Sequence, residues 1–296
     1  MFKKNRKILY IIVLVFFIMF VFYYWQNHTL QITRYVFAYE NLPKSFDGYR
    51  IVQISDMHGK TFGSKNTALS NKIKSLKPDI LLITGDMMSS TIIDEGAFLD
   101  FLDQFNKACP IYMCLGNHEQ IASKIINNDR YLNFLNNIRD RGVILLDNEK
   151  TKIKSGEDTI TLSGLSLELY HYSRRDLESY DENMSLTELY MEEVLDKAPK
   201  NFNILLAHNP AYFDVYASWG ADLILAGHIH GGIIRIPFLG GLFSPDRVFF
   251  PDYDAGLFEN GSSKMIVNRG LGYSKVNIRL FNRPEISFIE LQVKHE

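Results

Sequence analysis

Residues 50–59 have the sequence R-I-V-Q-I-S-D-M-H-G, and this stretch decides the fold class. Its first six residues form a largely apolar run, which is typical of a strand buried on both faces. The run ends at Asp56, His58 and Gly59, which are polar or turn-forming. A buried strand that carries reactive side chains at its carboxyl end is a common feature of parallel α/β sheets.

The same arrangement repeats along the chain. Strand-like runs at 79–84 and 111–115 alternate with helical spacing at 66–76 and 98–109. This β-α-β-α-β order predicts a parallel core sheet with helices outside it. The pattern also predicts a helix at 128–141, a polar insertion at 170–200 that is helical in its second half, and strands at 32–37, 143–147, 151–153, 159–165, 203–206, 223–226 and within 264–293.

The N-terminus differs from the rest of the chain. Residues 8–25 carry no charge and follow a basic flank that contains Lys3, Lys4, Arg6 and Lys7. An uncharged run of this length approaches the ~20 residues that a transmembrane helix needs. It ends in Tyr-Tyr-Trp without the small-residue cleavage site of a signal peptide, which favours an uncleaved anchor.

The division expected from this contrast is a basic flank and transmembrane anchor at 1–28, followed by one domain at 29–296. A basic flank stays on the cytoplasmic side, so we expect a single-pass protein of the cell membrane with its domain on the outer face.

Composition limits the other functions. The net charge of −2 in 296 residues is nearly neutral, so no nucleic-acid partner is expected. Cys109 and Cys114 are too few for a disulfide framework and are interpreted as core residues, with a disulfide left open. His28, His171 and His295 belong to no motif and are interpreted as surface residues.

Five short polar motifs follow predicted strands. They are Ser55–Gly59, Gly85–Asp86, Gly116–Glu119, Ala207–Asn209 and Gly227–Gly231. Because the carboxyl ends of parallel strands share one edge of a sheet, the motifs are expected to converge in space. Asp-x-His or Gly-Asp alone is weak evidence, since a Gly-Asp pair is usually a turn. Gly-Asn-His-Glu is more suggestive, and Gly-His-x-His-Gly is stronger because two imidazoles there have no obvious core role. Their joint occurrence argues against a purely structural origin.

The motifs supply four imidazoles, two carboxylates and one amide: Asp56, His58, Asp86, Asn117, His208, His228 and His230. Mixed nitrogen and oxygen donors suit Zn, Mn or Fe, and the absence of a thiolate argues against a structural zinc site. Seven donors are too many for one tetrahedral ion and match two ions if a carboxylate bridges them. Two ions about 3.5–4 Å apart form a clamp for a phosphate ester, with a bridging hydroxide as nucleophile.

This ordered set of motifs resembles the calcineurin-like metallophosphoesterase superfamily. It is most similar to the bacterial membrane-associated branch, because a Gly-His-x-His-Gly-Gly run precedes an apolar, proline-containing stretch, here 236–240. Arg269–Gly272 and Asn282–Glu285 are similar to that branch as well. The resemblance extends from about Tyr49 to the C-terminus.

The resemblance implies a four-layer α/β/β/α sandwich of two mixed sheets. It assigns Asp56, His58 and His230 to one metal, Asn117, His208 and His228 to a second, and Asp86 to a bridge between them. The ions would be two divalent metals, with Mn, Fe, Zn and Mg all open. His118 would contact the phosphate or protonate the leaving oxygen, oriented by Glu119 or another acid.

The function implied is metal-dependent hydrolysis of phosphoester bonds, with a membrane or cell-envelope phosphoester or pyrophosphate as the favoured substrate class. Two other functions fit the sequence less well. A catalytically silent binding module of the same fold would be expected to lack ligands, whereas every position is filled here. A metallopeptidase would be expected to carry His-Glu-x-x-His on a helix, which this sequence lacks.

Overall fold

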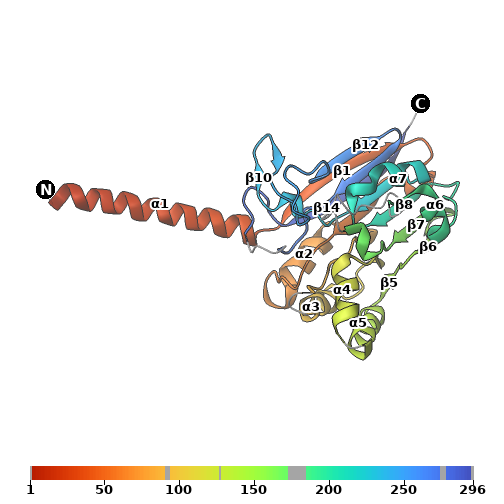
Figure 1. Cartoon of the computed structure of the whole chain (residues 1–296), viewed down its shortest axis with the longest axis horizontal. Helices are drawn as coiled ribbons and strands as arrows, with labels where there is room; N and C mark the ends of the chain where they lie inside the picture. Colours follow the sequence, from red (N-terminus) through yellow and green to blue (C-terminus); the bar gives the residue numbers. More distant parts are fainter. Residues whose placement is uncertain (1, 91–93, 127, 173–184, 274–277, 295–296) are drawn as a thin grey trace.

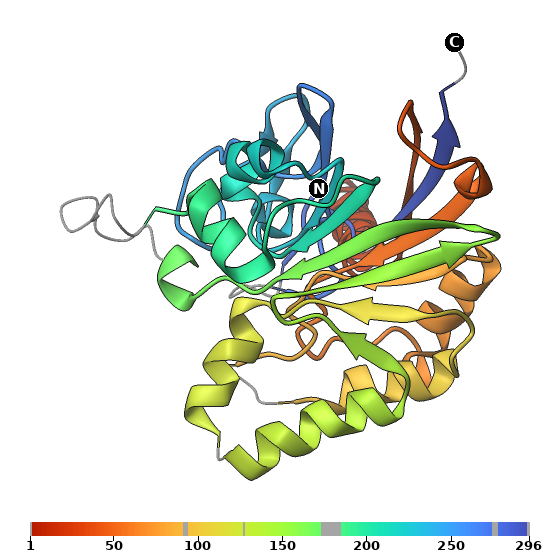
Figure 2. The same cartoon turned by 90° about the vertical axis from the view of Figure 1, so that its right-hand side faces the viewer.

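Two mixed sheets form the centre of the molecule (Figures 1 and 2). The computed structural model describes residues 2–90, 94–126, 128–172, 185–273 and 278–294. In this part of the chain the first sheet has six strands in the order β1 (Gln31–Tyr39), β14 (Glu285–Val293), β2 (Tyr49–Ile54), β3 (Ile80–Ile83), β4 (Ile111–Met113) and β5 (Val143–Leu145). The second has the order β12 (Gly256–Asn260), β13 (Ser263–Val267), β9 (Leu223–Ala226), β8 (Asn203–Ala207), β7 (Asp158–Leu165) and β6 (Glu149–Ser155).

The strands at the centre of each sheet run parallel. In the first sheet β2, β3, β4 and β5 pair in parallel, while β14 is antiparallel to β2. In the second sheet β7, β8, β9 and β13 pair in parallel, while β6 and β12 are antiparallel. The parallel order therefore places several carboxyl ends of strands side by side in each sheet.

The central strands are apolar throughout because both of their faces are covered. In β3, Leu81 and Ile83 pack toward the helices, whereas Ile80 and Leu82 face the other sheet. In β9, Leu225 faces the first sheet and Ile224 packs outward. Alternate residues thus enter different apolar layers. Because both faces are buried, these strands show no alternation of apolar and polar residues in the sequence.

Helices cover both outer faces, as Figure 2 shows. The helices over the first sheet are α2 (Thr67–Ser75), α3 (Gly96–Phe105), α4 (Asn117–Ile125) and α5 (Asn128–Asp140), and those over the second are α6 (Glu188–Leu195) and α7 (Phe213–Trp219). The expected four-layer α/β/β/α sandwich of two mixed sheets is therefore confirmed. Helices α4 and α7 were not predicted, because each is short and directly follows a polar motif or turn.

Two side-chain placements refine the sequence analysis. His171 was expected on the surface, but it is buried, and its carbonyl accepts hydrogen bonds from Asn209 and Tyr212. That prediction is wrong because tertiary packing against the second sheet covers a segment that is polar in sequence. Cys114 is buried and Cys109 is half-buried, and both are free thiols. His295 and residues 173–184 lie outside the described residues.

Helix α1 (Phe2–His28) extends away from the sandwich (Figure 1). Among the described residues, the segment Arg6–His28 is long and apolar enough to cross a membrane, and its most apolar window makes no buried contact in the chain. A helix that is apolar all round has no hydrophilic face to present to water. Its composition therefore fits a lipid environment.

The last turn of α1 is joined to the domain through Asn27. The Asn27 side chain is fully buried and donates to the carbonyl of Arg279 at 3.1 Å, while the Arg279 N–H donates back to Asn27 Oδ1 at 2.8 Å. The carbonyl of Asn27 accepts from Lys60 Nζ at 2.6 Å. The boundary between 28 and 29 stays a prediction, and these bonds favour a domain fragment that begins before Asn27.

Replacing Asn27 tests this junction. Asn27→Leu keeps the size of the side chain but leaves two backbone groups of Arg279 without their partner. We expect the free energy of unfolding to fall by about 1–3 kcal/mol. Thermal unfolding of the full chain in detergent measures it, with the exposed Asn136→Leu on α5 as control. Equal stability of the two variants would contradict the proposed junction.

Candidate metal centre

The five motifs lie at the carboxyl ends of parallel strands from both sheets. Asp56, Asp86 and Asn117 follow β2, β3 and β4, while His208 and His228 follow β8 and β9. Because the two sheets pack face to face, the ends of these strands meet at one edge of the sandwich. The structure brings all seven predicted donors to this edge.

One group of donors consists of Asp56, His58 and His230, whose candidate ligand atoms all lie within 4.8 Å of one another. His230 Nε2 lies 3.3 Å from Asp56 Oδ1 and 3.0 Å from His58 Nε2. Burial lowers the pKa of His58 to about 3 and holds the pKa of His230 well below its ordinary value. Neutral imidazoles with lone pairs that converge beside a carboxylate can bind a metal ion.

A second group consists of Asp86, His208 and His228, again within 4.8 Å. His208 Nδ1 bonds the carbonyl of Thr84, so the ring is fixed with Nε2 at 3.1 Å from Asp86 Oδ2. Burial opposes a charge on His208, but Asp86 and Asp56 outweigh it and raise its pKa to about 10. The two carboxylates therefore stabilise positive charge next to His208 Nε2, whether a proton or a metal ion carries it.

The side chain of Asn117 gives a separate indication that this site suits a metal ion. Its side chain is buried, and Oδ1 has no hydrogen-bond partner among the described residues. A buried amide oxygen without a partner is costly, so such atoms normally mark an unfilled interaction. Asn117 follows β4 at the same edge of the sandwich as the other donors. A metal ion bound by Asn117 Oδ1 would satisfy this oxygen.

The backbone at the centre is strained. Five of the seven predicted donors have positive φ values between 47° and 69°: Asp56, His58, Asp86, His228 and His230. Non-glycine residues rarely adopt this left-handed region, and strain of this kind gathers at functional sites. Two glycines let the backbone come close to the carboxylates. A Cβ at Gly116 would overlap Asp86 Oδ1, and a Cβ at Gly227 would overlap Asp56 Oδ2.

Glu119 holds two donor loops together. Its buried carboxylate accepts backbone N–H groups from Asp86 at 2.8 Å, Met87 at 2.7 Å, Met88 at 3.2 Å and Gly116 at 2.9 Å. Burial and the nearby Asp86 raise the pKa of Glu119 to about 7. Glu119 therefore binds backbone amides and does not orient His118 as expected from the resemblance.

His118 lies in the first turn of α4 (Asn117–Ile125). Its backbone N–H donates to Asp86 Oδ1 at 2.8 Å, and its Nδ1 accepts the backbone N–H of Ser90 at 3.1 Å. Because a backbone N–H can only donate, neutral His118 carries its hydrogen on Nε2. Candidate ligand atoms of His58, Asp86 and His118 also lie within 4.8 Å. His118 is thus close enough to contact either a metal or a substrate.

Two further residues were missed in the sequence. Asp246 accepts a hydrogen bond from His228 Nε2, with its two oxygens at 3.0 and 3.1 Å. This bond leaves Nδ1 as the nitrogen of His228 that can bind a metal. Arg279 is buried with Nη2 at 3.4 Å from His230 Nδ1. Neither residue lies in a strand-end motif, so no pattern in the sequence singles it out.

Known proteins are similar to this chain in sequence over most of its length. A sequence model of the family described as calcineurin-like phosphoesterase matches residues 49–232. The uncharacterised metallophosphoesterase YkuE of Bacillus subtilis is 27% identical, over 91% of this chain and 88% of that protein. The phosphodiesterase YaeI of Escherichia coli is 27% identical over 82% of each chain. The UDP-2,3-diacylglucosamine pyrophosphatase LpxG of Chlamydia muridarum is 28% identical, over 88% of this chain and 90% of that protein.

The role of Asp246 can be tested through metal affinity. Carboxylates that orient a ligating histidine typically contribute 10–100-fold in metal affinity. Asp246→Ala should therefore weaken binding of a divalent ion at the His228 site by about that factor. Titration with Zn²⁺ against a competing chelator measures it. The matched control is Asp252→Ala, an exposed acid of the same segment. Unchanged affinity in Asp246→Ala would remove Asp246 from the site.

Proposed function

The chain belongs to the calcineurin-like phosphoesterase family, and from this premise we propose that it hydrolyses phosphoester bonds with two divalent metal ions. The observation that supports two ions is the position of Asp86. Its Oδ2 lies 3.1 Å from His208 Nε2 in one group of donors and 3.7 Å from His58 Nε2 in the other. A carboxylate between two sets of imidazoles is suited to bridge two cations.

The proposed ligands follow these groups. One ion would be held by Asp56, His58 and His230, a second by Asn117, His208 and His228, and both by Asp86. The orphaned oxygen of Asn117 supports the second set. The mixed donors are compatible with Mn, Fe, Zn or Mg.

The protein's own residues would position the substrate. When bound, a metal pair supplies charge neutralisation for the phosphoryl group and an activated water. His118 Nε2 is the free nitrogen of that ring because Ser90 uses Nδ1. It can donate a hydrogen bond to a phosphoryl oxygen or transfer a proton to the leaving oxygen. His58 lies against the His118 ring, with centroids 4.5 Å apart, which limits how far His118 can turn.

We further propose a phosphoester or pyrophosphate of the membrane or cell envelope as substrate. Helix α1 would keep the centre close to a bilayer as a single-pass anchor, with the catalytic domain on the outer face. LpxG, a pyrophosphatase by name, is similar over most of both chains. The near-neutral net charge gives no support for a nucleic-acid substrate. The convergence of all seven donors disfavours a silent binding module.

The first test is metal content and hydrolysis. Purified protein should carry close to two divalent ions per chain and hydrolyse at least one of p-nitrophenyl phosphate, bis-p-nitrophenyl phosphate and a lipid-linked pyrophosphate. Because Asp86 would hold both ions, Asp86→Ala should lose metal from both sites, whereas Asp56→Ala should lose mainly one ion. Elemental analysis and a rate assay measure these effects.

The control for this test is Asp140→Ala, an exposed acid on α5. A single ion in the wild type, unaffected by Asn117→Ala, would refute the second site. Two ions without hydrolysis of any of these esters, across Mn, Fe, Zn and Mg, would favour the silent binding module.

His118 is tested by the leaving group. A proton donor contributes about 10²–10⁴-fold in rate, and most for a basic leaving group. His118→Asn should therefore reduce kcat strongly for an alkyl phosphate ester and weakly for a p-nitrophenyl ester, with metal content unchanged. An equal loss on both esters would indicate that His118 only positions the phosphate. A loss of bound metal would make it a ligand.

A further inference from the structure

Large apolar side chains gather on the surface where α1 meets the domain. We name this set the apolar rim: Phe238, Leu239, Phe249, Phe250 and Phe281. Phe238 is fully exposed, and the others are largely or half exposed. Phe238, Leu239 and Phe281 line one surface concavity, whose other side chains include Pro237, Pro251 and the charged Arg235, Asp252 and Asp254. Scattered apolar residues are normal on a surface, but a contiguous group marks a contact site.

The centre of the rim is a small hairpin outside both large sheets. Strands β10 (Arg235–Ile236) and β11 (Gly240–Gly241) are antiparallel, and their turn carries Phe238 and Leu239 at its tip. The turn closes with Leu239 N–H donating to the carbonyl of Ile236 at 3.0 Å. Figure 1 shows the hairpin on the side of the domain from which α1 leaves. The apolar side chains at the tip of this turn, Phe238 and Leu239, are not buried against the rest of the chain.

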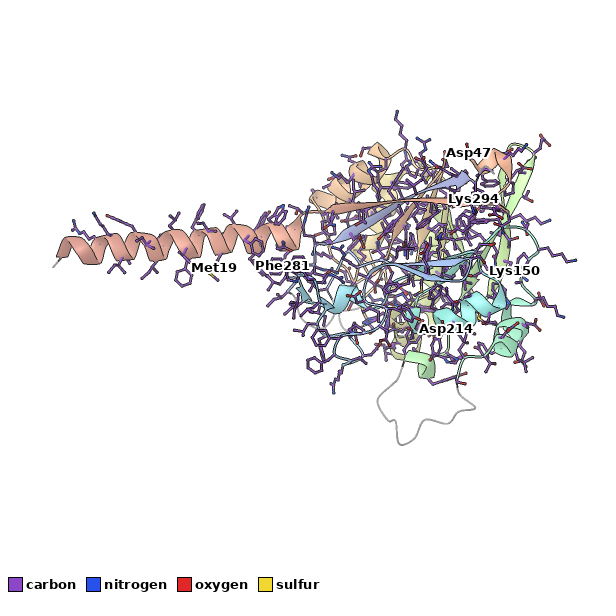
Figure 3. The ribbon with its side chains drawn as sticks, turned by 90° about the horizontal axis from the view of Figure 1, so that it is seen from above. Met19, Asp47, Lys150, Asp214, Phe281 and Lys294 are labelled. Atoms are coloured by element: carbon purple, nitrogen blue, oxygen red, sulfur yellow. The ribbon has the colours of Figure 1, made fainter. Side chains whose placement is uncertain are left out.

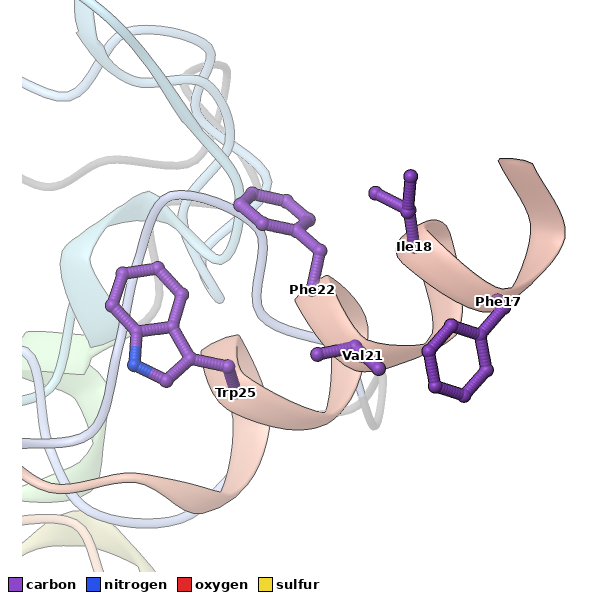
Figure 4. A pocket seen from close by; sticks show the side chains of 5 residues that line it. All are labelled: Phe17, Ile18, Val21, Phe22 and Trp25. Carbon is purple, nitrogen blue, oxygen red and sulfur yellow. The ribbon is translucent and has the colours of Figure 1, made fainter. Parts of the chain in front are cut away.

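Contacts with α1 fix the height of the rim along that helix. The Phe281 ring lies 5.6 Å from the ring of Phe22, and Phe22 lies 6.2 Å from Trp25. Figure 3 shows Phe281 near the domain end of α1, and Figure 4 shows Phe22 and Trp25 on that end of the helix. Phe22 precedes Trp25 by three residues, which is about 4.5 Å farther into the apolar part of the helix at 1.5 Å per residue. The Arg283 guanidinium lies over the Trp25 ring at 4.6 Å. Aromatic and basic residues of this kind mark the interface between lipid and water.

We propose that the apolar rim enters the membrane interface beside α1 and holds the metal centre at the lipid surface. This proposal rests on the proposed function in taking α1 as the membrane anchor. The occupant is a lipid surface because the rim is continuous with the anchor: if Phe22 is in lipid, Phe281 beside it is at the same height. A second copy of the chain is the competing occupant.

The rim is also tied to the metal centre. Asn282, next to Phe281, is buried, and its Nδ2 donates to the carbonyls of His230 at 2.7 Å and Ile233 at 3.0 Å. The hairpin begins at Arg235, five residues after His230. The loop that carries His230 is therefore clamped between two membrane-facing segments. A headgroup phosphoester could reach the metals while its acyl chains stay in the bilayer.

The test measures the environment of the hairpin tip in the full chain. Phe238→Cys is labelled with the polarity-sensitive dye NBD and reconstituted into phosphatidylcholine vesicles. We expect the emission of the dye to shift to shorter wavelength and to be quenched by brominated phosphatidylcholine. The control is Leu189→Cys on α6, a largely exposed leucine on another part of the domain. It should keep its aqueous emission, and unsubstituted protein gives the background of Cys109.

Flotation with the vesicles separates the possible failures. Protein that does not float refutes the anchor in the proposed function. Protein that floats but keeps aqueous emission at position 238 refutes the rim alone. A shift that resists brominated lipid and grows with the protein-to-lipid ratio shows contact between two copies and also overturns the proposal. The emission of the dye does not depend on catalysis, so the test of the apolar rim stands even if the protein hydrolyses none of the esters.

Discussion

Two buried carboxylates, Asp56 and Asp86, impose the constraint on which the site depends. Both are fully removed from water, and both lie within 4 Å of His58 and His208 nitrogens. Burial raises the pKa of Asp56 above its ordinary value, while His208 and His118 overcome burial and hold that of Asp86 well below its own. Charges of the same sign in a dry interior are stable only with nearby positive charge or strong hydrogen bonds. A cation bound beside the two carboxylates would satisfy this demand.

The surrounding structure serves to hold these carboxylates in place. The N–H groups of His228 and His118 donate to Asp56 and Asp86, and both donors lie at the start of turns that follow central strands. Glu119 fixes the loops after β3 and β4 by accepting four backbone N–H groups. Such outer contacts orient the ligands and are as much a part of a metal centre as the ligands themselves. The strained backbone conformations at these donors persist because several hydrogen bonds hold them in place.

Sequence patterns predicted the central strands, the layers implied by the family resemblance, and the residues that converge, but not β10, β11 or β12. They succeeded because a buried parallel strand is an apolar run and because its carboxyl end has a fixed place in the fold. They did not predict Asp246 or the partner of His118, since those contacts are made across long loops. The burial of Asn27 and His171 was also missed, because an isolated polar side chain carries no periodicity. Tertiary contacts decide such positions, and a single sequence does not record them.

The central claim is that one carboxylate joins two metal ions. Electron paramagnetic resonance of the protein loaded with Mn²⁺ tests it most directly, because two ions that share a bridging ligand are magnetically coupled. A shared carboxylate predicts a coupled spectrum in the wild type that disappears in Asp86→Ala. A spectrum of isolated Mn²⁺ ions in the wild type at saturating metal would contradict it.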